Sequence, residues 1–275
     1  EQASVLAHVR QAGNELLGLI NDVLDFSRNE NRQLRLTLQP TDLVELCEHV
    51  AAVHWSKARS KHLQMRLNLD PALPALMALD PHRVQQVLHN LLSNAIKFSE
   101  HGEVVLWARR HGDWVWCGVD DQGPGISAEL LPRLFQPFEQ GEELGQLRAQ
   151  GTGLGLAICR QLMEQMGGEI RVEPVATGGS RFICAWPLKE TQEKAPWQPR
   201  FKQISLQLPP EELAYVRAWL AEFGVTEEAT APGLAATQDE QGLRAWSWQG
   251  EPWIPGAVVS LLQPRLVQGS GEVAD

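Results

Sequence analysis

The chain has 275 residues, of which 43% are hydrophobic and 21% are charged, as expected for one sizeable globular domain with one or two smaller units. Its net charge of −10 at pH 7 argues against nonspecific binding of nucleic acid or of an anionic membrane surface. We find no secretory signal and no apolar run near the roughly 18 residues that a membrane span needs. No CxxC pair occurs, so the cysteines are predicted to be buried free thiols, as in a reducing compartment. They are Cys47, Cys117, Cys159 and Cys184.

The first predicted element is one long helix over residues 2–28. Apolar and small residues recur there at alternating spacings of four and three, which predicts a coiled-coil-like seam that needs a partner helix. The seam positions are Val9, Gly13, Leu16, Ile20 and Val23. Residues 29–42 then read as a linker that ends in a short strand.

Residues 40–190 mix helical and strand patterns. Helices are predicted over 42–58, 81–99 and 153–166, and strands over 62–70, 103–110, 114–121, 169–175 and 181–188. Asp80 and Pro81 supply an N-cap and a first-turn proline for the second helix, and Gly167 and Gly168 end the third. The order of elements predicts an α+β fold, with helices on one face of a mixed, mostly antiparallel sheet.

Residues 200–275 form a separate, smaller region after a linker at 190–200. A strand over 204–208 and a helix over 209–224 open it, and the remainder is rich in Trp, Gly and Pro. The strand and helix resemble the start of a receiver domain, but no acid pair follows the strand. We therefore predict a small α/β region, either degenerate and receiver-like or a truncated interaction domain.

The helix over 81–99 carries polar residues along one edge. Asn90, Asn94 and Lys97 are spaced by four and three, so they fall within roughly 60° of each other, away from the apolar face. Carboxamide oxygens suit Mg²⁺, and a lysine offers a point charge to phosphate. The alternative interpretation is a solvated helix face without a ligand.

Two glycine-rich stretches follow. In VDDQGPGI, residues 119–126, a strand ends in two acids, and a carboxylate there can accept a hydrogen bond from an exocyclic amine such as that of adenine. In QGTGLGLAI, residues 150–158, glycines precede a helix, and free N–H groups at a helix start favour an anion. No Lys-Ser/Thr pair follows as in a P-loop, and no βαβ unit completes a dinucleotide fingerprint. The alternatives are an acidic turn and a glycine-rich helix cap.

These stretches, in this order, resemble the ATP-binding domain of sensor histidine kinases, within the superfamily that includes gyrase, Hsp90 and MutL. HNLLSNAIKF matches the N box, DQGPGI and GTGLGL the two glycine boxes, LFQPFEQ the F box with Phe135 and Phe138, and GGSRF the closing strand. LLGLINDVLDFSRNE looks like the second helix of the dimerisation hairpin of hybrid kinases. The resemblance covers about residues 1–190. It implies a Bergerat-type sandwich over 41–190, preceded by a hairpin helix at 1–30 and a linker at 31–40.

The resemblance also implies roles for individual residues. Asp121 would bind the adenine amine, Asn94 would be the Mg²⁺ ligand with Asn90 beside it, and Lys97 would contact phosphate. Residues 127–150 would form a lid over the ATP. Further nucleotide contacts would come from Gly123 and Gly125 at the adenine pocket, from Phe138 and Arg148 of the lid, and from Gly151, Thr152, Gly153, Leu154, Gly155 and Leu156 at the phosphates.

The sequence departs from the family pattern at two places. Gln150 stands where a glycine often precedes TGLGL, which puts lid closure in question. No histidine has the acid, arginine and proline that follow a phospho-acceptor, so the acceptor is expected outside this chain. The eight histidines are His8, His49, His54, His62, His82, His89, His101 and His111. We interpret His8 as a helix-surface residue and His89 as a local polar contact.

The expected function is that of a histidine kinase fragment that uses Mg-ATP in two-component signalling. A gyrase-like ATPase is disfavoured, because Asn90 replaces the glutamate that activates water in those relatives and an amide cannot accept a proton. The remaining alternative is an inactive nucleotide-binding regulatory module. The resemblance implies a homodimeric parent, a response regulator or receiver domain as partner, and no nucleic acid. It also implies a cytoplasmic location without direct membrane contact, with the parent attached to the inner membrane.

Overall fold

The computed structural model describes most of the chain between Arg35 and Trp253. The described residues are 35–139, 152–175, 178–191, 203–223, 225–229, 231, 233–238, 244–248 and 251–253. The predicted helix over 2–28 and residues 140–150 of the predicted lid lie outside them. Within the described residues, no helix is both long and apolar enough to cross a membrane.

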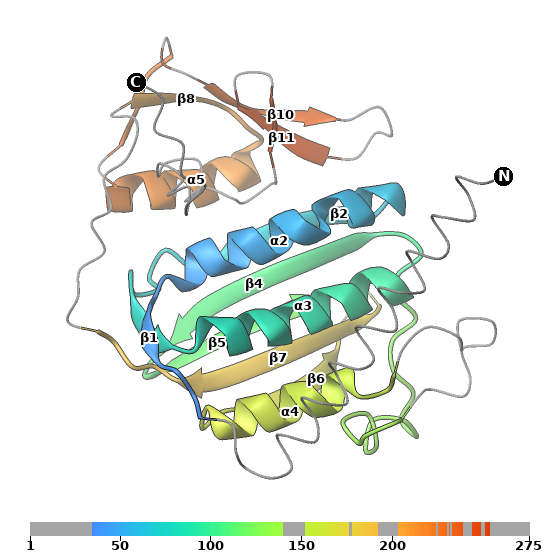
Figure 1. The fold of residues 1–275 in the computed structure, drawn as a ribbon. Helices are drawn as coiled ribbons and strands as arrows, with labels where there is room; N and C mark the ends of the chain where they lie inside the picture. Colours follow the sequence, from blue (N-terminus) through green and yellow to red (C-terminus); the bar gives the residue numbers. More distant parts are fainter. Residues whose placement is uncertain are drawn as a thin grey trace, which may run out of the picture.

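Residues 39–187 form two layers, with three helices on one face of a five-stranded sheet (Figure 1). The elements are β1 (Gln39–Thr41), α2 (Leu43–Ser60), β2 (Gln64–Leu69), β3 (Met77–Leu79), α3 (Pro81–Phe98), β4 (Glu103–His111), β5 (Trp114–Asp120), α4 (Gly155–Gln165), β6 (Glu169–Pro174) and β7 (Ser180–Pro187). The sheet order is β2-β4-β5-β7-β6, and only the β2–β4 pair is parallel. The predicted α+β class, with helices on one face of a mostly antiparallel sheet, is therefore confirmed.

Alternation along the strands builds the core between these two layers. On β7, Phe182, Cys184 and Trp186 face the helices, while Ile183 joins Trp107 on the opposite face of the sheet. The four cysteines are all buried and free, as predicted. The apolar stripe of α3, from Val84 to Ile96, is buried against this sheet and leaves its polar edge at the side.

The C-terminal unit is a second, smaller sheet with one described helix. Its elements are β8 (Gln203–Gln207), α5 (Pro210–Phe223), β9 (Thr226–Glu227), β10 (Gly233–Gln238), β11 (Arg244–Trp248) and β12 (Glu251–Trp253), in the order β12-β11-β10-β8-β9. The predicted strand and helix that open it are present. The strand β8 pairs parallel with both β9 and β10, as neighbouring strands of a receiver sheet do, whereas β10, β11 and β12 pair antiparallel. The receiver-like character of this unit therefore stays a prediction.

Candidate active site

The candidate site begins with the polar edge of α3. Asp80 caps this helix and Pro81 occupies its first turn, so the helix begins where the sequence predicted. Asn90, Asn94 and Lys97 are each half-buried at the edge of the apolar stripe. The three side chains thus share one partly buried edge of α3, as their spacing predicted, and their contact with a ligand stays a prediction.

Asn90 lies directly against the start of α4. A Cβ atom at Gly155 would lie 2.5 Å from both Nδ2 and Oδ1 of Asn90, so only glycine allows the two helices to approach this closely. The helix begins at Gly155, two residues later than predicted, because Gly153 has a φ of +70° that cannot continue a helix. The structure thus brings the N box and the second glycine box into contact.

The start of α4 presents uncapped backbone donors. Leu154 is the N-cap residue, and its buried apolar side chain has no oxygen to accept the first-turn N–H groups. Those groups belong to Gly155, Leu156 and Ala157. Thr152 Oγ1 accepts the N–H of Leu154 at 3.0 Å and so orders the turn before the helix. This arrangement suits a phosphate.

Asp121 is buried, with a relative exposure of 7%. Its Oδ1 accepts hydrogen bonds from the N–H groups of Gly123 at 2.9 Å and Ser180 at 3.2 Å. No described residue donates to Oδ2, which therefore remains available to a ligand donor. Burial raises the pKa of the Asp121 carboxyl, the charge of Asp120 adds to this, and the two N–H donors oppose it.

The two adjacent acids point to opposite faces of the sheet. Asp120 accepts a hydrogen bond from Trp107 Nε1 at 2.7 Å and pairs with Arg181, so it is occupied on the face without helices. Asp121 lies on the helix side, near the end of α3. A Cβ at Gly123 would lie 3.1 Å from Asp121 Oδ1 and 3.2 Å from the carbonyl oxygen of Phe98. Asp121, and not Asp120, therefore lies on the same face of the sheet as the polar edge of α3.

Glycines surround Asp121 on the side of β7 and the first glycine box. A Cβ at Gly179 would lie 2.0 Å from the carbonyl oxygen of Asp121, so β7 begins in close contact with the first glycine box. Gly125 has a φ of +76°, which glycine adopts at no cost. The sequence analysis predicted a role for Gly123 and Gly125. It included Gly179 and Ser180 in the GGSRF motif but predicted no contact for them.

Phe138, from the middle of the predicted lid, contacts the second glycine box. Its N–H donates to the carbonyl oxygen of Gly153 at 3.0 Å. Phe138 has a φ of +65° and its side chain is 67% exposed. Arg148 and Gly151, two predicted contacts, lie outside the described residues. The lid therefore stays a prediction.

Lys61 contacts the end of α3 that carries Lys97, and the sequence did not predict this contact. From the end of α2, its ammonium donates to the carbonyl oxygens of Ile96, Lys97 and Ser99 at 2.6, 2.9 and 2.9 Å. It thereby caps the C-terminal end of α3, where Lys97 stands. Burial lowers the pKa of both lysine side chains, and Lys57 adds repulsion to each. No local pattern links residues 35 positions apart, so the sequence carried no signal for this contact.

His89 makes the local polar contact that we expected of it. Its Nδ1 lies 3.0 Å from Nε2 of His54 on α2. Burial is the largest cause that lowers the pKa of both rings, to about 4 for His54. The pair therefore joins α2 to α3 in its neutral form at physiological pH.

Comparisons with known proteins agree with this geometry. Residues 79–190 match the family described as histidine kinase-, DNA gyrase B- and HSP90-like ATPase. Over 244 residues the chain is 36% identical to the sensor histidine kinase RcsC of Escherichia coli K12, covering 89% of this chain and 24% of that protein. Over 199 residues it is 36% identical to the sensor histidine kinase GacS of Pseudomonas protegens, covering 70% and 22%. The chain thus spans about a quarter of these relatives.

Solved structures show the same likeness. The structure of full-length ShkA in complex with AMPPNP aligns with a TM-score of 0.65 and 30% identity, over 84% of this chain and 49% of that one. The histidine kinase AdeS of Acinetobacter baumannii aligns with a TM-score of 0.57 and 25% identity, over 69% and 86%. The first alignment extends beyond the ATP-binding region of the chain.

Proposed function

Because the chain belongs to the histidine kinase-, DNA gyrase B- and HSP90-like ATPase family, in its sensor histidine kinase group, we propose that residues 41–190 bind Mg-ATP and transfer its γ-phosphoryl group to a histidine of a dimerisation hairpin. The observation that carries the proposal is the contact of one helix edge with both glycine boxes. Asn90 lies against Gly155, and Phe98 lies against Gly123 beside Asp121. One ligand along α3 can therefore reach both glycine boxes.

Asp121 is the group proposed to recognise adenine. The N–H groups of Gly123 and Ser180 donate to Oδ1, so Oδ2 is the oxygen that would accept a hydrogen bond from the exocyclic amine. A buried acceptor discriminates strongly, because a base that lacks this donor would leave the carboxylate desolvated and unpaired.

The phosphates would lie between α3 and the start of α4. First-turn N–H groups from Gly155 onward and the ammonium of Lys97 supply positive potential there. Burial and Lys57 lower the pKa of Lys97, and a bound polyphosphate would favour its charged form. These groups position and neutralise the transferred phosphoryl group, which is most of what phosphoryl transfer requires from a protein.

The donor set fits Mg²⁺ as a nucleotide-borne ion. Asn94, with Asn90 beside it, offers neutral amide oxygens, and Mg²⁺ ordinarily keeps waters and phosphate oxygens as further ligands. Among the described residues, no cluster of three or more His, Cys, Asp or Glu side chains could hold a metal ion by itself. When bound, the ion would neutralise charge on the phosphates. Since Asn90 cannot accept a proton from water, the site suits transfer to an imidazole better than hydrolysis.

The test is incubation of this chain with γ-labelled ATP, with and without a separate hairpin fragment that carries an acceptor histidine. We expect acid-labile label on the hairpin only. Asn94→Ala should remove the Mg²⁺ dependence of nucleotide binding and leave the melting temperature unchanged, with the neighbouring Ser93→Ala as the control. Label on this chain alone would show that one of its own histidines is an acceptor.

A second candidate is an inactive regulatory module that binds nucleotide, which the non-glycine residue Gln150 before the second glycine box favours. Nucleotide binding without any label on the added hairpin would support it. For the parent we propose a homodimer at the cytoplasmic face of an inner membrane, with a receiver domain or response regulator as phosphate acceptor. Co-expression of two differently tagged parents, followed by purification through one tag, tests the dimer.

A further inference from the structure

The N-terminal end of α3, opposite the proposed phosphate site, holds the segment that enters the domain. Asp80 is 4% exposed and uses both carboxylate oxygens. Oδ1 accepts the N–H of Arg83 at 3.2 Å and caps the helix, while Oδ2 accepts the N–H of Thr37 at 2.9 Å. One buried carboxylate thus binds the entering linker to the helix that carries the N box.

The strand before Asp80 also holds the segment that leaves the domain. β1 pairs with β3 antiparallel, Gln39 opposite Leu79. The N–H of Ala78, in the middle of β3, donates to the carbonyl oxygen of Lys189 at 2.8 Å, and Met77 forms a bridge with Glu190. The chain therefore enters and leaves the ATP-binding domain at β3, which leads directly into α3.

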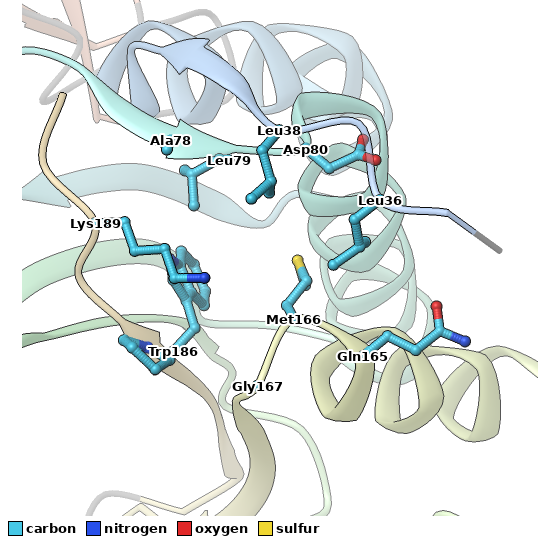
Figure 2. Close-up of a pocket in the computed structure, with 11 residues that line it drawn as sticks. Leu36, Leu38, Ala78, Leu79, Asp80, Gln165, Met166, Gly167, Trp186 and Lys189 are labelled. Carbon is cyan, nitrogen blue, oxygen red and sulfur yellow. The ribbon is translucent and has the colours of Figure 1, made fainter. Parts of the chain in front are cut away.

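Apolar contacts alone do not fix the position of the entering linker, because one of its two leucines is largely exposed. A hollow of about 170 Å³ lies between the linker, the end of β3, the end of α4 and the exit segment, and Figure 2 shows the residues that line it. Leu36 and Leu38 line it from the linker, with Met166 across from them. Leu38 remains 48% exposed. The linker before β1 is thus only partly packed, and the hydrogen bond from Thr37 to Asp80 fixes it where the β1–β3 pairing has not yet begun.

A second N-cap aspartate shows that capping does not require this arrangement. Asp42 begins α2, and its Oδ1 accepts the N–H groups of Val44 at 2.9 Å and Glu45 at 3.0 Å. Its Oδ2 is buried without a hydrogen-bond partner. Asp42 is therefore a cap alone, whereas Asp80 is a cap and a bond to the linker.

We propose that Asp80 is a positioning residue that fixes the direction in which the hairpin linker leaves the N-box helix, and so aligns an attached hairpin with the phosphate site. The inference rests on the proposed kinase function. Asn90, Asn94 and Lys97 lie 10 to 17 residues after Asp80 on the same helix, about 15–26 Å along its axis. A rigid helix with the linker bound at one end and the nucleotide site near the other sets their relative orientation. Losing the bond leaves the site intact and the hairpin misaligned.

The test uses the parent chain with its hairpin attached, and variants that keep the cap but lose the linker bond. Asn and Ser are both good N-cap residues. In Asp80→Asn an amide N–H₂ replaces the second acceptor, and in Asp80→Ser the side chain is too short to reach Thr37. Asp42→Asn is the matched control, because no second bond is lost there. The readouts are nucleotide affinity, transfer to a separate hairpin, autophosphorylation of the attached hairpin and hydrogen exchange at the Thr37 amide.

For both Asp80 variants we expect faster exchange at Thr37 and autophosphorylation reduced about tenfold, the order expected for loss of one charge-assisted hydrogen bond. Nucleotide affinity and transfer to the separate hairpin should stay within about twofold of wild type. Unchanged autophosphorylation would overturn the proposal. A parallel loss of nucleotide affinity or of transfer to the separate hairpin would also overturn it, since Asp80 would then be structural. Failure of the wild type to label any hairpin would contradict the kinase function instead.

Discussion

The ATP-binding domain and the C-terminal unit are both built on five-stranded sheets, but their functional content differs. In the first, polar residues and glycines gather at the ends of elements, as with Asn90 against Gly155 and Asp121 beside Gly123. In the second, the described side chains are used for packing. Trp219 is 1% exposed, and the Tyr215 hydroxyl accepts the N–H of Leu69 of the ATP-binding domain at 3.3 Å. Similar sheets therefore carry different roles, because function depends on the residues at the loops.

The C-terminal unit is nevertheless joined to the ATP-binding domain. Burial raises the pKa of Tyr215, and the apolar residues of α5 belong to the same core cluster as α2 and β2. The residues that hold the two parts together are thus different from the residues proposed to contact a ligand, and substitutions in the two sets should have different effects.

The largest effect is expected for Trp219→Ala. Truncation of a fully buried tryptophan leaves a cavity and should lower the free energy of unfolding of the C-terminal unit by about 3–5 kcal/mol, measured by chemical denaturation. Arg217→Ala, on the exposed side of the same helix, is the control and should cost less than about 1 kcal/mol. Nucleotide affinity should not change with either variant. A matching loss of affinity for Trp219→Ala would show that the C-terminal unit shapes the nucleotide site.

Asp121→Asn should weaken ATP binding about a hundredfold, because the amide places a donor against the adenine amine inside a buried site. Calorimetry provides the measurement. Asp120→Asn is the matched control, since this neighbouring acid pairs with Arg181 on the other face of the sheet. Equal binding by wild type and Asp121→Asn would remove Asp121 from the adenine site.

Gly155→Ala should reduce phosphotransfer to a supplied hairpin about tenfold. The added Cβ would lie 2.5 Å from the Asn90 amide, which must then move away from the phosphates. In an Asn90→Ala background the same glycine change should have little further effect, because the clash is gone. Additive losses in the double variant would mean that Gly155 acts through its backbone alone.

Asp42→Asn should produce the smallest effect, a pH-dependent change in melting temperature. Burial is the largest of the causes that raise the pKa of Asp42 from 3.8 to about 7. Between these values the folded state holds a proton that the unfolded state has released, so the free energy of unfolding falls as the pH rises. The variant lacks this loss, so it should match wild type near pH 4 and melt a few degrees higher at pH 8. Glu45→Gln, exposed in the same helical turn, removes a charge that adds to the rise in the Asp42 pKa, so it should weaken the pH dependence without abolishing it.

The main elements were predictable because their signals are local. Asp80 and Pro81 mark the start of α3, and alternation along residues 103–110 and 181–188 marks two strands. The order of the boxes identified the polar edge of α3 and the two glycine turns. These features depend on backbone conformation and on apolar spacing within about twenty residues.

Contacts between distant segments were decided only by the tertiary structure. Lys61 reaches the end of α3 from 35 residues away, and Thr37 meets Asp80 across 43 positions. The antiparallel strands of the C-terminal unit likewise depend on pairings that their Trp- and Gly-rich sequence did not indicate. Spacing along a chain specifies which face of an element a residue occupies. Which partner covers that face is set by how the layers pack, and packing depends on the whole chain at once.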